Sequence, residues 1–141
     1  MADLIITPAN VKNDTTLPCQ TKTGIAGGTI TAGQPLYADA ADSNKVKAAD
    51  SNVSAALAAV VGIAAHGATL DQPITYFVPL GDFNPGASVT IGETYYLSET
   101  VGGIQPSADL GTGEFVTPLF IGVTTSKVRL DIMRATGIQK P

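Results

Sequence analysis

The chain has 141 residues, of which 44% are hydrophobic and only 14% charged, and its formal net charge is -4. This length suits one domain with its own core, and the low charge and high aliphatic content exclude a disordered chain or a coiled coil. A negative net charge argues against nucleic-acid binding, which needs a basic face. The one cysteine, Cys19, allows no internal disulfide.

The N-terminal segment Met1–Lys22 is polar after Leu4–Thr7 and carries Pro8 and Pro18. We therefore predict an extended arm or an edge strand that stays outside the core. The segment lacks a basic region followed by an apolar stretch and a cleavage site, so we expect no secretory signal. Residues 23–141 are predicted to form a single β domain.

Turn signals rich in Gly, Pro, Asn and Asp divide this domain into short pieces. They lie at Thr23–Gly28, Thr31–Pro35, Asp42–Asn44, Asp50–Asn52, Leu70–Pro73 and Asp82–Gly86. Runs rich in β-branched and aromatic residues predict strands at Ile74–Pro79, Ser88–Ile91, Thr94–Ser98, Phe115–Thr124 and Lys127–Met133. In the last run Val128, Leu130 and Ile132 alternate with charged residues, which indicates a half-buried strand. Many short strands predict an all-β fold, a β-sandwich or barrel.

An Ala-rich stretch, Val53–Ala65, is the longest apolar run of the chain. It is shorter than the ~18 residues that a membrane-spanning helix needs, so we expect no membrane partner and a soluble protein. Its end, Val60–Ala64, is predicted to be a strand, and Ser54–Ala59 is either a short helix or a loop.

An internal repeat relates the two halves of the domain, residues 24–81 and 82–136. Gly27–Asp50 aligns with Gly86–Asp109 without a gap, and the identical pairs are Gly27/Gly86, Thr31/Thr90, Gly33/Gly92, Tyr37/Tyr96, Ala49/Ala108 and Asp50/Asp109. One added residue then sets Val60–Ala64 against Phe120–Thr124, with Gly62 opposite Gly122. Half-units this short would expose their apolar strands, so we expect both copies to share one core.

Candidates for catalysis are few. The one histidine, His66, follows an apolar strand and no G-x-S-x-G nucleophile motif is present, so we predict a loop histidine. Cys19 has no basic neighbour in sequence, which favours an incidental or structural thiol. Carboxylates for glycoside hydrolysis are available, but no spacing brings a pair together and Trp is absent; they are Asp71, Asp82, Glu93, Glu99 and Glu114. We therefore predict no enzyme.

Metal and cofactor sites are equally poorly supported. Asp39, Asp42 and Asn44 resemble a fragment of a calcium loop without its glycine and bidentate glutamate, so we predict a solvated hairpin tip and no metal. Lys45 lies between two predicted strands, superficially like the modified lysine of lipoyl or biotinyl carriers. Asn44 replaces the acidic residue usual there, so a carrier is kept as a minor alternative. No cofactor is expected.

Several phrases of the sequence resemble small structural proteins of tailed bacteriophages. They are the "G-x-x-Y, polar hairpin, A-D, V-G-I-A" pattern, GETYYLSETVGGIQPSADL, FIGVTTS and KVRLDI, and they are most similar to capsid decoration (cement) proteins. The resemblance spans residues 24–133. It implies a β-rich fold, homo-oligomers with trimers favoured, and contacts with the major capsid protein on the outer capsid surface.

The expected function is thus that of a non-enzymatic virion protein, made in the host cytoplasm, that holds capsid subunits together. Under this hypothesis Met1–Lys22 contacts the capsid or a neighbouring copy. The alternative is a phage tail or fibre module that binds a host surface. It would need an exposed aromatic or polar pocket, for which the candidates are Tyr76, Phe77, Tyr95 and Tyr96; as alternating strand residues they favour core or cross-strand positions.

Overall fold

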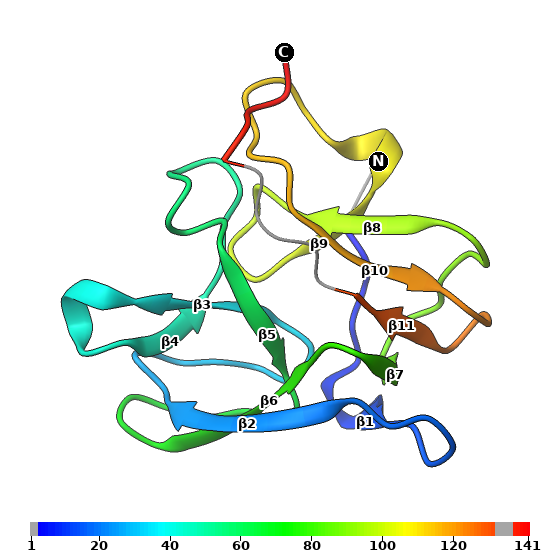
Figure 1. Ribbon diagram of the computed structural model, residues 1–141, viewed down its shortest axis with the longest axis horizontal. Coiled ribbons are helices and arrows are strands. Elements are labelled where there is room, and N and C mark those ends of the chain that lie inside the picture. The colour runs from blue at the N-terminus through cyan, green and yellow to red at the C-terminus, as the bar shows by residue number, and fades with distance from the viewer. Residues whose placement is uncertain (1–2, 132–136) are drawn as a thin grey trace.

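The computed structural model describes residues 3–131 and 137–141, which fold into two antiparallel β-sheets stacked as a sandwich rather than a closed barrel (Figure 1). The six-stranded sheet has the order β1 (Val11–Asn13), β7 (Gly81–Pro85), β11 (Val128–Leu130), β10 (Pro118–Gly122), β8 (Thr94–Leu97) and β9 (Ile104–Pro106). The five-stranded sheet has the order β2 (Gln20–Ile25), β6 (Pro73–Val78), β5 (Val60–Ala64), β3 (Pro35–Asp39) and β4 (Lys45–Ala48). The predicted all-β sandwich is confirmed.

Three short 3₁₀ turns complete the described elements: η1 (Pro8–Asn10), η2 (Ala40–Asp42) and η3 (Ser107–Asp109). None of the helices in the described part of the chain is long and apolar enough to cross a membrane.

The two sheets repeat one strand order. The order β2-β6-β5-β3-β4 in the first half matches β7-β11-β10-β8-β9 in the second, and β1 is added at the edge of the second sheet. Each half of the chain therefore builds most of one sheet. The strands cross the predicted bounds of the half-repeats, since β2 begins at Gln20 and β7 at Gly81.

A shared β-bulge corrects the alignment of the repeat. Leu36 pairs with Gly62 before the register between β3 and β5 shifts, and Tyr95 pairs with Phe120 where the register between β8 and β10 shifts. Gly62 therefore corresponds to Phe120, and the predicted match of Gly62 with Gly122 is wrong by two residues. A shift of two preserves which face each side chain takes, so the sequence pattern alone could not reveal it.

The main core lies between the sheets and is closed by aromatic rings. Phe83 of β7 lies 5.0 Å from Phe77 of β6 and 5.7 Å from Phe120 of β10, measured between ring centroids. A smaller cluster covers the other face of the five-stranded sheet, where Leu36 and Ile74 are fully buried. Strands β3, β5 and β6 are thus buried on both faces, which explains their short runs of consecutive apolar residues, whereas β2 at the edge is exposed.

Most predicted strands are confirmed. Val60–Ala64 is β5, and Ile74–Pro79, Thr94–Ser98 and Phe115–Thr124 contain β6, β8 and β10. In β11, Val128 and Leu130 are buried while Arg129 is exposed, as the alternation predicts; Ile132 and Met133 lie outside the described residues. Ser54–Ala59 is a loop with one turn, in which the Ala58 N–H donates to the Ser54 carbonyl at 3.2 Å.

Three local predictions are wrong. Ser88–Ile91 is not a strand, although Val89 is buried. Asp82–Gly86 forms most of β7 rather than a turn, because Pro85 falls at the last strand position, opposite Val11, where its missing N–H is tolerated. Thr23–Gly28 begins inside β2.

The N-terminal segment contributes one edge strand to each sheet. β1 pairs with β7, and β2 pairs with β6. The prediction of an edge strand is therefore confirmed, but the segment does not stay outside the core: Val11 is 8% and Cys19 5% exposed, and both belong to the main cluster.

Candidate functional site

His66 lies in the loop after β5, as predicted, and both of its ring nitrogens contact backbone. Nε2 accepts a hydrogen bond from the Thr75 N–H at 3.1 Å, and Nδ1 lies 2.8 Å from the Gly67 carbonyl oxygen. With Nε2 as acceptor, the proton is on Nδ1 and is donated to Gly67. This imidazole holds the connection between β5 and β6.

Four of the five carboxylates named from the sequence each have a different partner. Asp71 accepts from Lys45, Asp82 from Arg129, Glu93 from Ser107, and Glu114 from Ser51 and Gln105. Glu99 is exposed in the turn after β8. Among residues 3–131 and 137–141, no three His, Cys, Asp or Glu side chains gather as metal ligands would.

The hairpin between β3 and β4 is a cluster of ion pairs. Lys47 lies 2.8 Å from Asp39 and 3.2 Å from Asp42, and Lys45 lies 2.6 Å from Asp71. The residues at the tip, where Asn44 has a φ of 59°, precede Lys45, which is the first residue of β4. The lysine that resembled a carrier lysine is therefore on a strand and paired, not at a hairpin tip.

The aromatic candidates divide between core and half-buried positions. Tyr95 and Phe77 are each 3% exposed and pack in the main core, whereas Tyr76 and Tyr96 are intermediate. The Tyr95 hydroxyl also accepts a hydrogen bond from the Thr90 N–H at 2.9 Å. The predicted core role is confirmed for Tyr95 and Phe77.

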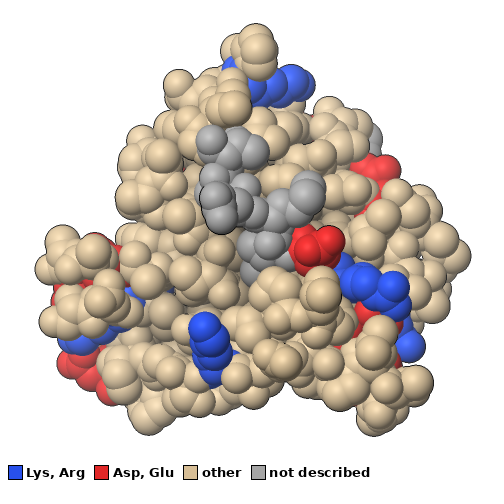
Figure 2. Space-filling view, in the orientation of Figure 1, with Lys and Arg blue, Asp and Glu red and all other residues tan. Residues whose placement is uncertain are grey.

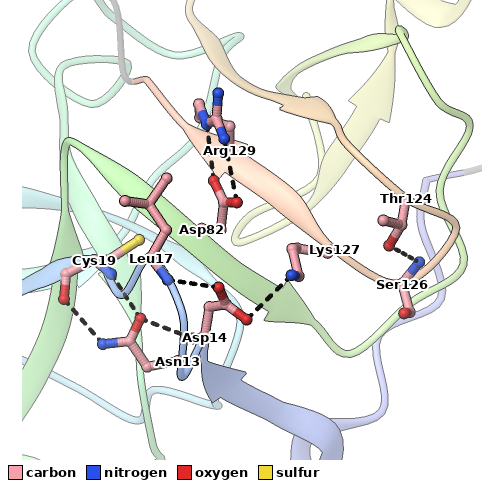
Figure 3. A network of polar contacts seen from close by, with 9 residues as sticks. All are labelled: Asn13, Asp14, Leu17, Cys19, Asp82, Thr124, Ser126, Lys127 and Arg129. Carbon is pink, nitrogen blue, oxygen red and sulfur yellow. Dashed lines mark hydrogen bonds and ion pairs between the residues drawn. The ribbon is translucent and has the colours of Figure 1, made fainter.

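A different site emerges at the loop between β1 and β2, residues 13–19, which we call the pinned loop (Figure 3). The Asn13 side chain closes its base, donating to the Cys19 carbonyl at 2.9 Å and accepting from the Cys19 N–H at 2.7 Å. The Asn13 carboxamide thus bonds to both backbone groups of Cys19, as a residue on a paired strand would, and fixes the distance between the two ends of the loop. Asp14 then holds the interior, accepting from the Leu17 N–H at 2.8 Å.

One ion pair attaches the pinned loop to the second sheet, and a second ion pair lies within that sheet, at the strand residue that the loop contacts. Lys127 lies 3.2 Å from the Asp14 carboxylate, and the Leu17 N–H followed by this ammonium holds the pKa of Asp14 below its usual value. The Arg129 Nε donates to Asp82 at 2.8 Å, and the Asp82 backbone bonds to both Leu17 and Asp14. Strands β7 and β11 therefore position the loop (Figure 3).

Cys19 ends the pinned loop as a buried thiol. Burial, followed by the negative charges of Asp82 and Asp14, raises the pKa of Cys19 to about 12. The thiol stays protonated at neutral pH and is a poor nucleophile, in agreement with the predicted structural role.

The pinned loop presents an apolar tip to solvent. The side chains of residues 15–18 are exposed, with Leu17 48% exposed, and Leu80 on the adjoining β6–β7 connection is 65% exposed. Figure 2 shows charged side chains in small separate groups, with most of the visible surface between them uncharged. A rigid, hydrogen-bonded loop with aliphatic tips is a typical contact surface, because little entropy is lost on binding.

A polar hollow of about 370 Å³ lies nearby, between the N-terminal segment and the loop after β7. Its polar lining comes from Thr7, Asn10, Lys12, Asn84, Ser88 and Ser126.

The sequence analysis found parts of this site but not their arrangement. It placed the exposed face of β11 correctly but expected Cys19 outside the core, where the structure buries it. It also missed that Asn13 and Lys127 contact the same loop, and that Arg129 holds Asp82, whose backbone bonds to that loop. The signal available was the polar run after β1, in which Asn and Asp favour loops bonded by their own side chains. No protein-family model matches the chain, and a search of curated proteins finds no match.

Proposed function

We propose that the chain is a non-enzymatic virion structural protein that binds the outer capsid surface and stabilises contacts between major capsid protein subunits, as a homo-oligomer for which a trimer is favoured. The resemblance of the sequence to capsid decoration proteins suggests this role. The sandwich of two repeated sheets is compatible with it, since it offers two broad layers with loops at their ends.

The pinned loop is the observation that carries the proposal. Leu17 and Leu80 lie on two adjoining loops, and the Asp82 N–H, near the start of β7, donates a hydrogen bond of 2.7 Å to the Leu17 carbonyl. Side-chain bonds from Asn13 and Asp14 fix the loop before any partner arrives. Exposed aliphatic side chains on a pre-organised loop favour binding, because they bury apolar surface and little conformational entropy is lost.

Binding to undecorated capsids tests the proposal. The wild-type chain is expected to bind capsids of the same virus saturably and to raise their melting temperature, because a ligand stabilises the state that it binds. Replacing both Leu17→Asp and Leu80→Asp should weaken binding by at least about tenfold, which corresponds to ~1.4 kcal/mol. The matched control is Val53→Asp, at a position 61% exposed on a different loop. Absence of saturable binding by the wild-type chain would refute the function; equal loss in the control would refute the site.

A phage tail or fibre module that binds a host surface is the second candidate. The polar hollow beside Lys12 and Asn84 favours it, because hydroxyl, amide and ammonium groups suit polar surface sugars. Binding to host cells that falls on Asn84→Ala, with capsid binding absent, would replace the first proposal with this one.

A further inference from the structure

The two sheets differ in how their edges are completed. In the first sheet the chain just beyond β2 meets β4: Ala26 forms a bridge with Val46, and the Gly27 N–H donates to the Val46 carbonyl at 2.8 Å. The first half-repeat therefore satisfies this edge carbonyl by itself.

In the second sheet the corresponding carbonyl belongs to Ile104. The register shows this, because Ala38 pairs with Val46 in the first hairpin and Leu97 pairs with Ile104 in the second. The donor to Ile104 is not the chain beyond β7 but the Leu4 N–H, at 2.8 Å.

Residues 3–7, which we call the plug, thus lie between the edge strand β9 and the chain that follows β7. At its far end the Thr7 N–H donates to the Gly86 carbonyl at 2.7 Å, directly after β7. At its near end the Ser98 hydroxyl donates to Asp3 at 2.7 Å. We call the opening between Ile104 and Gly86 the slot. The plug fills this opening, whereas in the first sheet the chain beyond β2 contacts β4 directly.

The side chains of the plug alternate as in a strand. Leu4 and Ile6 pack against the main core, whereas Ile5 is 87% exposed. Two glycines make room for Ile6: a Cβ on Gly33 would lie 2.8 Å, and one on Gly86 3.3 Å, from its Cγ2. The slot is therefore shaped for an extended segment with apolar residues at alternate positions.

We propose that the slot is a strand-acceptor site and that, in the assembled protein, it receives the plug of a second copy. The plug itself shows the chemistry that the slot accepts, so the same residues of another copy make identical contacts. It is joined to β1 through η1 (Pro8–Asn10), whose exposed residues form no part of the core. Exchange of such a segment is a low-cost route to a closed oligomer. The inference rests on the proposed function, which requires copies to associate on a shell.

Chains carrying single cysteines test the exchange. Asp3 and Ser98 are in hydrogen-bond contact, so cysteines at these two positions can form a disulfide when a plug occupies a slot. One full-length chain carries Asp3→Cys and the other Ser98→Cys, both with Cys19→Ala to remove the native thiol. The two chains are co-expressed, purified, oxidised and separated by size without reductant.

Exchange predicts covalent pairs of the two different chains, which reductant separates. A chain with Lys22→Cys in place of Ser98→Cys is the matched control and should not cross-link to Asp3→Cys. Absence of mixed pairs, together with an internal disulfide in a chain carrying both Asp3→Cys and Ser98→Cys, would overturn the exchange. That internally linked chain is then tested on undecorated capsids. If it binds them, the capsid function stands without exchange; mixed pairs without capsid binding leave the exchange and refute the function.

Discussion

Arg129 lies opposite Asp82 on neighbouring strands, and its Nε donates to the carboxylate at 2.8 Å while Nη2 lies 3.4 Å from the second oxygen. The two ends of this pair differ in environment: the Asp82 side chain is 6% exposed and that of Arg129 is 47% exposed. A buried carboxylate thus depends on a cation that reaches it from the surface. Because the Asp82 backbone also bonds to Leu17, the ion pair helps to hold the strand residue on which the pinned loop rests in place.

Replacing Arg129 alone should therefore lower the stability of the protein more than replacing Arg129 and Asp82 together. Arg129→Met is expected to lower the melting temperature, since it leaves a buried charge without its partner. The double variant Asp82→Asn with Arg129→Met should recover part of the loss, because no charge remains to be desolvated. Thermal unfolding of the wild type, both single variants and the double variant checks this. A double variant no more stable than Arg129→Met would contradict the explanation.

Asp14 should make the protein acid-sensitive. Its pKa is lowered in the folded state, first by the Leu17 N–H and then by Lys127, so its contribution to stability is present above the ordinary value of 3.8. That contribution is lost as the pH falls through the lower, folded pKa. Asp14→Asn should accordingly be less stable than the wild type at pH 7 and differ less from it at pH 2.5. Melting temperatures at both pH values measure the difference; a constant gap would exclude Asp14 as its source.

Sequence patterns anticipated the fold well because the strands carry their own signals. The alternation around Val128 and Leu130 and the compact run at Val60–Ala64 both reflect one strand placed against a core. Asp82–Gly86 was predicted wrongly because the sequence Asn-Pro-Gly is typical of a turn. Asn84 and Pro85 instead end a strand because they pair with β1, which lies about seventy residues earlier in the chain. Long-range pairing overrides local preference there.

The site was less predictable than the fold for a related reason. Asn13 and Cys19 are close in sequence, but Lys127 reaches Asp14 of the pinned loop, and Arg129 reaches Asp82 beside it, only because β7 and β11 are neighbours. A period of two shows that charged residues of β11 face outward, yet it carries no information about which loop they meet. Similarly, no pattern in residues 3–7 distinguishes a free arm from a segment that completes a sheet.

The Cys19 thiol should be protected until the chain unfolds. It is 5% exposed and its pKa is raised to about 12, so a thiol reagent at pH 8 should label it far more slowly than in denaturant. Because the folded pKa is the higher one, the contribution of this thiol to stability is complete below its unfolded pKa and declines as the pH rises toward 12. Labelling followed by mass spectrometry checks the rate. The control, Cys19→Ala with Thr16→Cys on the exposed part of the pinned loop, should react at once in both states.

Glu114 is expected to be the least replaceable carboxylate. It is 2% exposed, and its Oε1 accepts from the Ser51 hydroxyl at 2.7 Å and the Gln105 amide at 2.8 Å, while Oε2 accepts from the Gly111 N–H. Glu114→Ala leaves these donors without an acceptor, and the free energy of unfolding should fall by about 1–3 kcal/mol for each buried donor left unpaired.

Glu114→Gln separates shape from hydrogen-bond capacity at this position. Its amide NH₂ must face at least one of the donors, so it should recover only part of the loss. Urea unfolding of both variants measures the two effects. A Glu114→Gln variant as stable as the wild type would show that the network does not depend on the carboxylate.

Phe83 should decide whether the two half-repeats unfold as one unit. Its ring contacts Phe77 of the first sheet and Phe120 of the second, so it links the layers as well as filling the core. Phe83→Ala is expected to cost about 3–5 kcal/mol, through lost burial and the cavity that remains. Ile91→Ala, at a position 64% exposed, should stay within about 0.5 kcal/mol of the wild type. If the sheets share one core, urea unfolding of Phe83→Ala remains a single transition at lower urea, followed equally by tyrosine fluorescence and circular dichroism. Two separated transitions would show instead that each half-repeat folds independently and that the ring contacts contribute little to the packing of one sheet on the other.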